Sequence, residues 1–152
     1  MNCWDSRRRS ERFGPQSQSQ RCSMLKLFCL AGGLLGFIGV AAGSFGAHGL
    51  KDLLEANGQS ANWETAVRYC LFHAVAIVAI AGLAATPGSG PASGLLAAAA
   101  GCFVAGVLIF SGFLGVLALT GIRILGAIVP IGGVLLLAGW AVLTAAIWRL
   151  KL

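Results

Sequence analysis

The chain has 152 residues, of which 57% are hydrophobic and 11% are charged, and its formal net charge is +6. Its mean hydropathy of +0.83 lies far above that of soluble proteins, and residues 69–122 contain no Asp, Glu, Lys or Arg. A soluble fold is therefore excluded, because water could not solvate such a surface. The charge does not indicate nucleic-acid binding, since the basic residues cluster before the first apolar segment and lack regularly interleaved aromatic side chains.

The N-terminal residues 1–23 are polar, rich in Ser, Gln and Arg, and show no apolar periodicity. We expect this extension to be disordered, because it has too few apolar side chains to bury one face. Met24 follows directly and is a possible start of the native chain. Residues 24–152 form the predicted membrane domain.

Four uncharged segments follow, and each is long enough to cross a hydrocarbon core of roughly 30 Å as a helix. The predicted spans cover residues 27–47, 69–85, 94–119 and 125–147. Between the first two, GLKDLLEANG places leucines on one side of a short helix and Lys51 with Glu55 on the other. Ser60 or Asn62 is expected to cap the next helix. The predicted fold class is all-α, an integral membrane bundle of four transmembrane helices with a short interfacial helix between the first and second.

Four spans place both termini and the 86–93 connection on the same side of the membrane. That side collects six basic residues before the first span and two in the C-terminal tail, against three on the other side. The positive-inside rule therefore predicts cytoplasmic termini. If the chain started at Met24, the basic residues would number three on each side. The richness in Ala and Gly suggests a bacterial cytoplasmic (inner) membrane.

Glycines in the first span recur at spacings of 4, 3, 4 and 3, which places five of them on one narrow helical stripe. The third span carries a similar stripe of small residues from Gly94 to Gly115. In lipid, close backbone approach along small residues replaces the hydrophobic drive for association. We therefore expect the first and third spans to pack closely, either with one another or across a subunit interface, although glycine is also simply frequent in membrane helices. The predicted packing residues are Gly32, Gly36, Gly39, Gly43, Gly46, Gly101, Gly112, Gly115, Pro130, Gly132 and Gly133.

The fourth span contains Pro130 followed by Gly132 and Gly133, which are expected to interrupt or kink its helix. Broken helices often line transport sites, whereas a single proline kink is more often architectural.

Polar side chains gather where the first span ends, the second begins and the third connects to the fourth, because antiparallel spans bring these points to one membrane face. Three of them, Thr65, Tyr69 and His73, recur every four residues and are expected to point into the bundle. The candidate polar cluster comprises His48, Lys51, Trp63, Glu64, Thr65, Arg68, Tyr69, His73 and Arg123.

An intramembrane histidine such as His73 is costly unless paired, so it is either a functional group or the partner in a structural hydrogen bond to Tyr69, Thr65 or a backbone carbonyl. If His48 and His73 lay at one depth on facing helices, they could hold a haem or, with Glu64, a metal. Helix separation at glycine-rich contacts argues against a haem, and the five cysteines form no CxxC pair. We predict no cofactor, no metal and no catalytic residue.

The segments GSFGAHGLKDLL, WETAVRYCLFH, SGFLGVLALTG and LGAIVPIGGVLLLAGW, read in this order, resemble the motifs of a small four-helix membrane family known as domain of unknown function 423. Its eukaryotic relatives resemble transmembrane protein 256. The resemblance covers about residues 25 to 148 and implies the fold and a membrane location, but no established activity. Cys70 stands where the family often has glutamine, and Phe113 and Gly115 stand where it often has serine and tyrosine, which would weaken any site built on those polar groups.

The predicted function is that of a noncatalytic helix-packing protein whose interfacial polar patch contacts the lipid bilayer, a membrane protein partner or a second copy of the chain. One alternative is a small oligomeric transporter or channel with His73 and Arg123 near its pathway. Another is a haem- or metal-binding membrane subunit.

Overall fold

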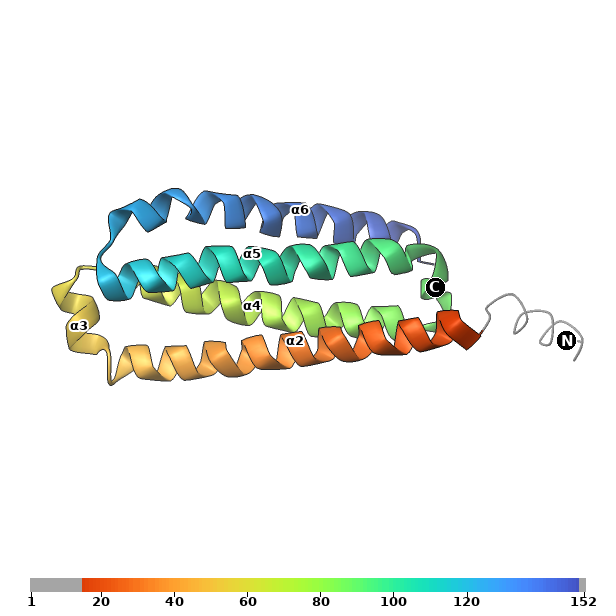
Figure 1. The fold of residues 1–152 in the computed structure, drawn as a ribbon, viewed down its shortest axis with the longest axis horizontal. Coiled ribbons are helices and arrows are strands. Elements are labelled where there is room, and N and C mark those ends of the chain that lie inside the picture. The colour runs from red at the N-terminus through yellow and green to blue at the C-terminus, as the bar shows by residue number, and fades with distance from the viewer. Residues whose placement is uncertain (1–14, 151–152) are drawn as a thin grey trace, which may run out of the picture.

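The computed structural model describes residues 15–150, in which helices are joined by short turns and no strand is present. Four long helices lie side by side, and a short helix crosses one end of the bundle (Figure 1). The four long helices are each long and apolar enough to cross a membrane. The predicted all-α class, with four spans and a short helix between the first and second, is therefore confirmed. The elements are α2 (Pro15–Ala47), α3 (Lys51–Ala56), α4 (Ser60–Ala85), the 3-10 segment η1 (Pro87–Ala92), α5 (Ser93–Thr120), the 3-10 segment η2 (Arg123–Ala127) and α6 (Val129–Trp148).

The first helix begins earlier than the apolar pattern predicts. Its backbone is helical from Pro15, within the segment expected to be disordered, and residues 1–14 lie outside the described residues. A proline suits the first helical position because its fixed φ is already helical and it has no N–H to leave unpaired. Once the apolar span forms a helix, each added residue gains one backbone hydrogen bond, so the polar residues after Pro15 can extend it.

The connection between α2 and α4 is tight and is anchored to α5. Leu54 of α3 is buried against the bundle, and Gly58 adopts a φ of +63°, a left-handed conformation that glycine accommodates without strain. The Asn57 side-chain amide donates to the carbonyls of Ala118 and Leu119, at 3.2 and 3.1 Å, near the C-terminal end of α5. Asn57 thereby satisfies two carbonyls that have no partner within their own helix.

The predicted caps of α4 are wrong. Gln59 occupies the N-cap position and makes no side-chain capping hydrogen bond, while Ser60 is already the first helical residue. The Asn62 amide donates instead to the Gln59 side-chain oxygen. The turn at Gly58 sets where α4 begins, one residue earlier than a Ser60 cap would require.

The order of packing is α2 on α4, α4 on α5, and α5 on α6. The expectation that the first and third spans pack closely on one another is wrong, because α2 and α5 touch only marginally. Short connections bring consecutive helices together as antiparallel neighbours, and this outweighs the matching small-residue stripes.

The glycine stripe of α2 faces α4. A Cβ built on Gly39 would lie 2.6 Å from the Leu71 side chain, and one on Gly32 would lie 3.0 Å from the Ala74 carbonyl oxygen. Gly43 faces Val67, Gly46 lies directly against the Trp63 indole, and Gly36 makes only a loose 4.0 Å contact with Ala74. The stripe therefore lets the backbone of α2 approach α4 along its length.

The stripe predicted in α5 does not make a comparable contact. Gly94, Gly101 and Gly112 have open space beside them, and only Gly115 comes near another element, 3.9 Å from the Trp63 ring. The contact between α5 and α6 instead uses Gly106 against Leu136, Gly139 against Phe103, and Gly132 against the Phe110 backbone. Spacing identifies a stripe but not the side of the helix on which the neighbour lies.

Pro130 does not kink a helix. It occupies the first turn of α6, where its missing N–H needs no partner, and the residues before it form η2. The candidate span Arg123–Trp148 therefore changes from 3-10 to α-helix just before the proline, where an interruption was predicted, whereas α6 itself runs unbroken from Val129 to Trp148.

The centre of the bundle is filled with apolar side chains from α4 and α5. Ile77, Ile80, Leu96, Phe103 and Val107 have 2% or less of their surface exposed. Side-chain packing rather than glycine contact joins the two middle helices.

Replacing Gly132 by Ala should destabilise the bundle, because the added methyl group would overlap backbone atoms of Phe110 that cannot rotate away. We expect a loss of about 2 kcal/mol, typical of overpacking, measured by unfolding in detergent micelles. Gly133→Ala is the matched control, since its methyl would make ordinary contact with the Phe110 ring at 3.7 Å. Equal stability of the two variants would contradict backbone contact at Gly132.

Candidate interfacial pocket and intramembrane histidine

The predicted polar cluster lies at the α3 end of the bundle, but its members face in different directions. His48, Lys51, Glu64, Arg68 and Arg123 are exposed, whereas Trp63 and Thr65 are half-buried and His73 is buried. Four members line a pocket between α2 and α4, Tyr69 and His73 contact aromatic rings of α5 or α6, and His48, Thr65 and Arg123 do not line the pocket.

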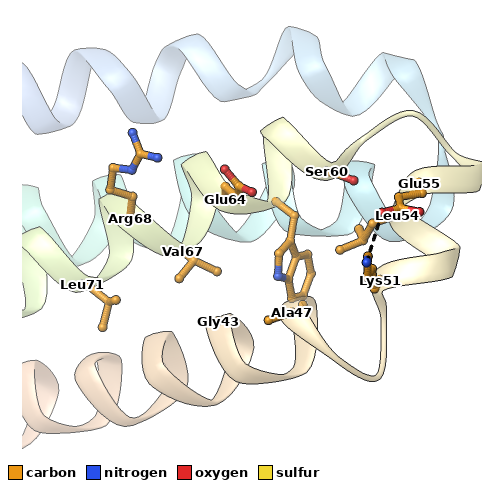
Figure 2. A pocket seen from close by; sticks show the side chains of 12 residues that line it. Gly43, Ala47, Lys51, Leu54, Glu55, Ser60, Glu64, Val67, Arg68 and Leu71 are labelled. Atoms are coloured by element: carbon orange, nitrogen blue, oxygen red, sulfur yellow. Dashed lines mark ion pairs between the residues drawn. The ribbon is translucent and has the colours of Figure 1, made fainter.

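The pocket has a volume of about 520 Å³ and is bounded by the end of α2, by α3 and by the first turns of α4 (Figure 2). Four members of the predicted cluster line it, namely Lys51, Trp63, Glu64 and Arg68. The remaining lining residues are Gly43, Gly46, Ala47, Leu54, Glu55, Ser60, Val67 and Leu71.

The pocket is amphipathic. Gly43, Val67 and Leu71 form its apolar part, toward the middle of the bundle, as Figure 2 shows. Two of its charged residues lie on α3, where Lys51 Nζ and Glu55 Oε1 are 4.0 Å apart with about 60% of each side chain exposed, while Glu64 and Arg68 follow along α4. The Lys51–Glu55 pair is the one ion pair within residues 23–150, and its exposure makes it weak.

Trp63 forms the wall of this pocket and joins α4 to α2. Its indole Nε1 donates a hydrogen bond of 3.1 Å to the Ala42 carbonyl, and its ring lies against Gly46. On its other side lies an apolar groove of about 300 Å³ between α2 and α5. A tryptophan that is apolar on its faces and polar at one edge suits this position between lipid and backbone.

Thr65, Tyr69 and His73 do not line this pocket. The Thr65 hydroxyl donates to the Ala61 carbonyl of its own helix, so it does not reach His73. The Tyr69 ring is 39% exposed and stacks on Phe110 with 4.5 Å between centroids. His73 is only 5% exposed and lies 5.1 Å from the Phe103 ring.

Both ring nitrogens of His73 have hydrogen-bond partners, which fixes its tautomer. Nδ1 lies 2.8 Å from the Tyr69 carbonyl oxygen, which can only accept, so Nδ1 carries the proton. Nε2 lies 3.2 Å from the Trp140 indole nitrogen, which can only donate, so Nε2 accepts. The neutral imidazole is thus fully satisfied and connects α4 to α6.

The geometry does not match the premise of a shared haem or metal site. His73 follows Trp63 by ten residues, a rise of about 15 Å along α4, whereas His48 lies just beyond the end of α2, near the level of Trp63. The two histidines are therefore not at one depth. Within the described residues, no three His, Cys, Asp or Glu side chains come together.

The two residues named for the oligomeric transport alternative lie apart within one copy of the chain. Arg123 is exposed in η2, beyond the end of α5, while His73 is buried well inside the span. The two side chains do not share a pathway in one copy of the chain.

Sequence reasoning missed Trp140 as the partner of His73 and omitted Glu55 and Ser60 from the cluster. An indole N–H in an apolar span needs an acceptor, and His73 is one of few acceptors in neighbouring spans, so a signal for this pair was present. Nothing in the sequence pattern predicts that Ser60 lies beside the pocket.

Comparison with known proteins identifies relatives without an assigned activity. Residues 42–133 match the family described as "Protein of unknown function (DUF423)", which agrees with the resemblance seen in the motifs. The chain is 42% identical over 125 residues to a UPF0382 membrane protein of Staphylococcus haemolyticus, covering 82% of this chain and 98% of the relative. It is 34% identical over 122 residues to the UPF0382 membrane protein YwdK of Bacillus subtilis, covering 80% and 96%. No solved structure matches the chain significantly.

Trp140→Phe should destabilise the protein by about 1 kcal/mol, because it removes the donor to His73 while keeping most of the ring. In a His73→Leu background the same change should cost much less, and a double-mutant cycle in detergent measures the difference. Trp148→Phe is the control, since Trp148 is 92% exposed and does not donate a hydrogen bond to His73. An equal cost in both backgrounds would show that the hydrogen bond does not join the helices.

Proposed function

Because the chain belongs to the DUF423 family and its relatives are membrane proteins of bacteria, we propose that it is a noncatalytic membrane protein whose pocket between α2 and α4 binds a phospholipid. The observation that carries this proposal is the amphipathic lining of the pocket, which combines four charged side chains of α3 and α4 with apolar side chains of α2, α3 and α4. A phospholipid likewise combines a charged headgroup with apolar acyl chains.

The position of the pocket along α4 supports this proposal. Arg68 lines the pocket and directly precedes the uncharged stretch of residues 69–122, so it marks the expected edge of the hydrocarbon core. Glu64 and Ser60 lie one and two turns further out, in the zone expected for lipid headgroups. The pocket volume is within the range of sites that hold small organic ligands.

A membrane protein partner or a second copy of the chain is the other occupant considered for this surface. A protein would have to match a narrow pocket with opposite charges on its rim, whereas the bilayer supplies lipid at high local concentration. An oligomeric transporter would need its pathway between copies of the chain, because Ile77, Phe103 and Val107 fill the centre of one bundle.

The same proposal includes a location in the bacterial cytoplasmic membrane with both termini in the cytoplasm. The start of α2 and the end of α6 lie at the end of the bundle opposite α3 (Figure 1). The Lys and Arg residues outside the spans are more numerous at that end, which the positive-inside rule assigns to the cytoplasm.

Fusions to the C-terminus of the full chain should report a cytoplasmic location in a bacterial host. A fusion to green fluorescent protein should fluoresce. A fusion to alkaline phosphatase should be inactive, since the phosphatase folds only outside the cytoplasm. A second pair of fusions truncated after Gly58 should give the opposite result, because Gly58 lies in the α3 connection. Matching signals from both positions would contradict the four-span topology.

The protein purified in mild detergent should retain phospholipid, detected by native mass spectrometry. Ala47→Trp should reduce the lipid-bound fraction severalfold, because Ala47 lines the pocket and an indole there would fill it. Ala61→Trp is the matched control, since Ala61 is exposed near the same end but does not line the pocket. Lipid-free protein, or equal loss in both variants, would overturn the proposal, as would a protein partner that copurifies and is released by Ala47→Trp alone.

A further inference from the structure

We propose that the pocket between α2 and α4 selects a zwitterionic phospholipid whose headgroup carries a primary ammonium, as phosphatidylethanolamine does. This inference rests on the proposed function, namely that the pocket binds phospholipid. It concerns the headgroup, which the charges on the rim must recognise.

The first observation is the charge balance of the rim. Four ionisable side chains line the pocket, and they comprise two cations, Lys51 and Arg68, and two anions, Glu55 and Glu64. An anionic headgroup without an ammonium would meet two carboxylates with no counter-charge of its own. A zwitterionic headgroup offers its phosphate to the two cations and its ammonium to the two carboxylates.

The second observation is the order of the charges along α4. Arg68 is four residues further into the span than Glu64, a rise of about 6 Å, and no ion pair joins the two side chains. In a phospholipid, the phosphate is attached to the glycerol, and the ammonium lies beyond it, away from the acyl chains. Arg68 is therefore placed to bind the phosphate, and Glu64 is placed to accept hydrogen bonds from the ammonium.

Lys51 and Glu55 on α3 can also contact the headgroup, because breaking their ion pair costs little free energy. Lys51 and Glu55 are 4.0 Å apart and mostly exposed, so the pair is weak and its members can turn toward a ligand. Figure 2 shows them at the α3 side of the pocket, with Glu64 and Arg68 following along α4. Both signs of charge are thus present at the outer rim as well.

The chemistry of the ammonium distinguishes two zwitterionic headgroups. An ethanolamine ammonium has three N–H donors for the Glu64 carboxylate, whereas a choline nitrogen carries methyl groups and has none. Charge-assisted hydrogen bonds are shorter and stronger than neutral ones, so the pocket should favour ethanolamine over choline. Glycerol headgroups lack a cation altogether and should bind more weakly.

The test uses the full chain reconstituted in nanodiscs that contain equal parts of phosphatidylethanolamine, phosphatidylcholine and phosphatidylglycerol with identical acyl chains. After release into mild detergent, native mass spectrometry measures the lipid that remains bound. We expect phosphatidylethanolamine to exceed phosphatidylglycerol by about fivefold, the order expected of one partly exposed ion pair.

Two variants assign the preference to the pocket. Glu64→Gln should bring the ratio of phosphatidylethanolamine to phosphatidylglycerol close to one, because the partner of the ammonium is lost. Arg68→Gln should lower the retention of all three lipids, because all three carry the phosphate. Arg123→Gln is the matched control, since Arg123 is an exposed cation at the same end of the bundle that does not line the pocket.

The outcomes separate the two proposals. Bound lipid with no preference for phosphatidylethanolamine would overturn the headgroup assignment and leave lipid binding intact. No bound lipid of any class would overturn both. A preference that survives Glu64→Gln, or that Arg123→Gln removes equally well, would also overturn the assignment, because the pocket would not be its source.

Discussion

The whole arrangement depends on close contact between helix backbones at a few glycines. Lipid surrounds apolar helices as favourably as neighbouring helices do, so association must come from tight packing. Gly39 and Gly46 allow α2 to approach Leu71 and Trp63 of α4, and Gly132 allows α6 to approach the Phe110 backbone of α5. The bundle is therefore built from two tight helix pairs, and the position of each glycine fixes the register of its pair. The contact between Gly46 and Trp63 also determines where α2 ends beside α4, and hence where the pocket opens.

Side chains rather than glycines hold the two pairs together. Ile77 of α4 and Phe103 of α5 are fully buried between the middle helices. The hydrogen bond from Trp140 to His73 then ties α6 to α4, with the Phe103 ring 5.1 Å from both the His73 and Trp140 rings. Glycine contacts fix the distance within a pair, whereas this aromatic layer fixes the orientation of one pair against the other. The two hydrogen bonds of His73 thereby give the buried ring a structural role.

Properties that depend on one helix alone could be predicted from the sequence, and properties that depend on its neighbours could not. Hydropathy and length determined the four spans, because each crossing is a local requirement of the bilayer. The α2 stripe was identified as a packing surface, but its partner was misassigned, since Gly101 and Gly112 of α5 have the same spacing and face open space. Pro130 was expected to interrupt or kink the fourth span, and the change from η2 to α6 does fall just before it, but α6 shows no kink because a proline fits the first turn of a helix.

In the candidate site, the sequence likewise predicts roughly how deep a residue lies in the membrane but not which neighbouring helix its side chain faces. Antiparallel topology brings most of the candidate residues toward the α3 end of the bundle, with His73 deeper in the span, but it carries no information about the side of α4 on which each lies. Consecutive residues on a helix point about 100° apart, so Arg68 lines the pocket while Tyr69 stacks on Phe110. The side of α4 that faces α5 and α6 carries the neutral Tyr69 and His73, and the buried His73 is satisfied by two hydrogen bonds, whereas the exposed Glu64 and Arg68 line the pocket. A ligand recognised by the charges of this pocket therefore approaches from the outer side of α2 and α4, rather than from the side packed on α5.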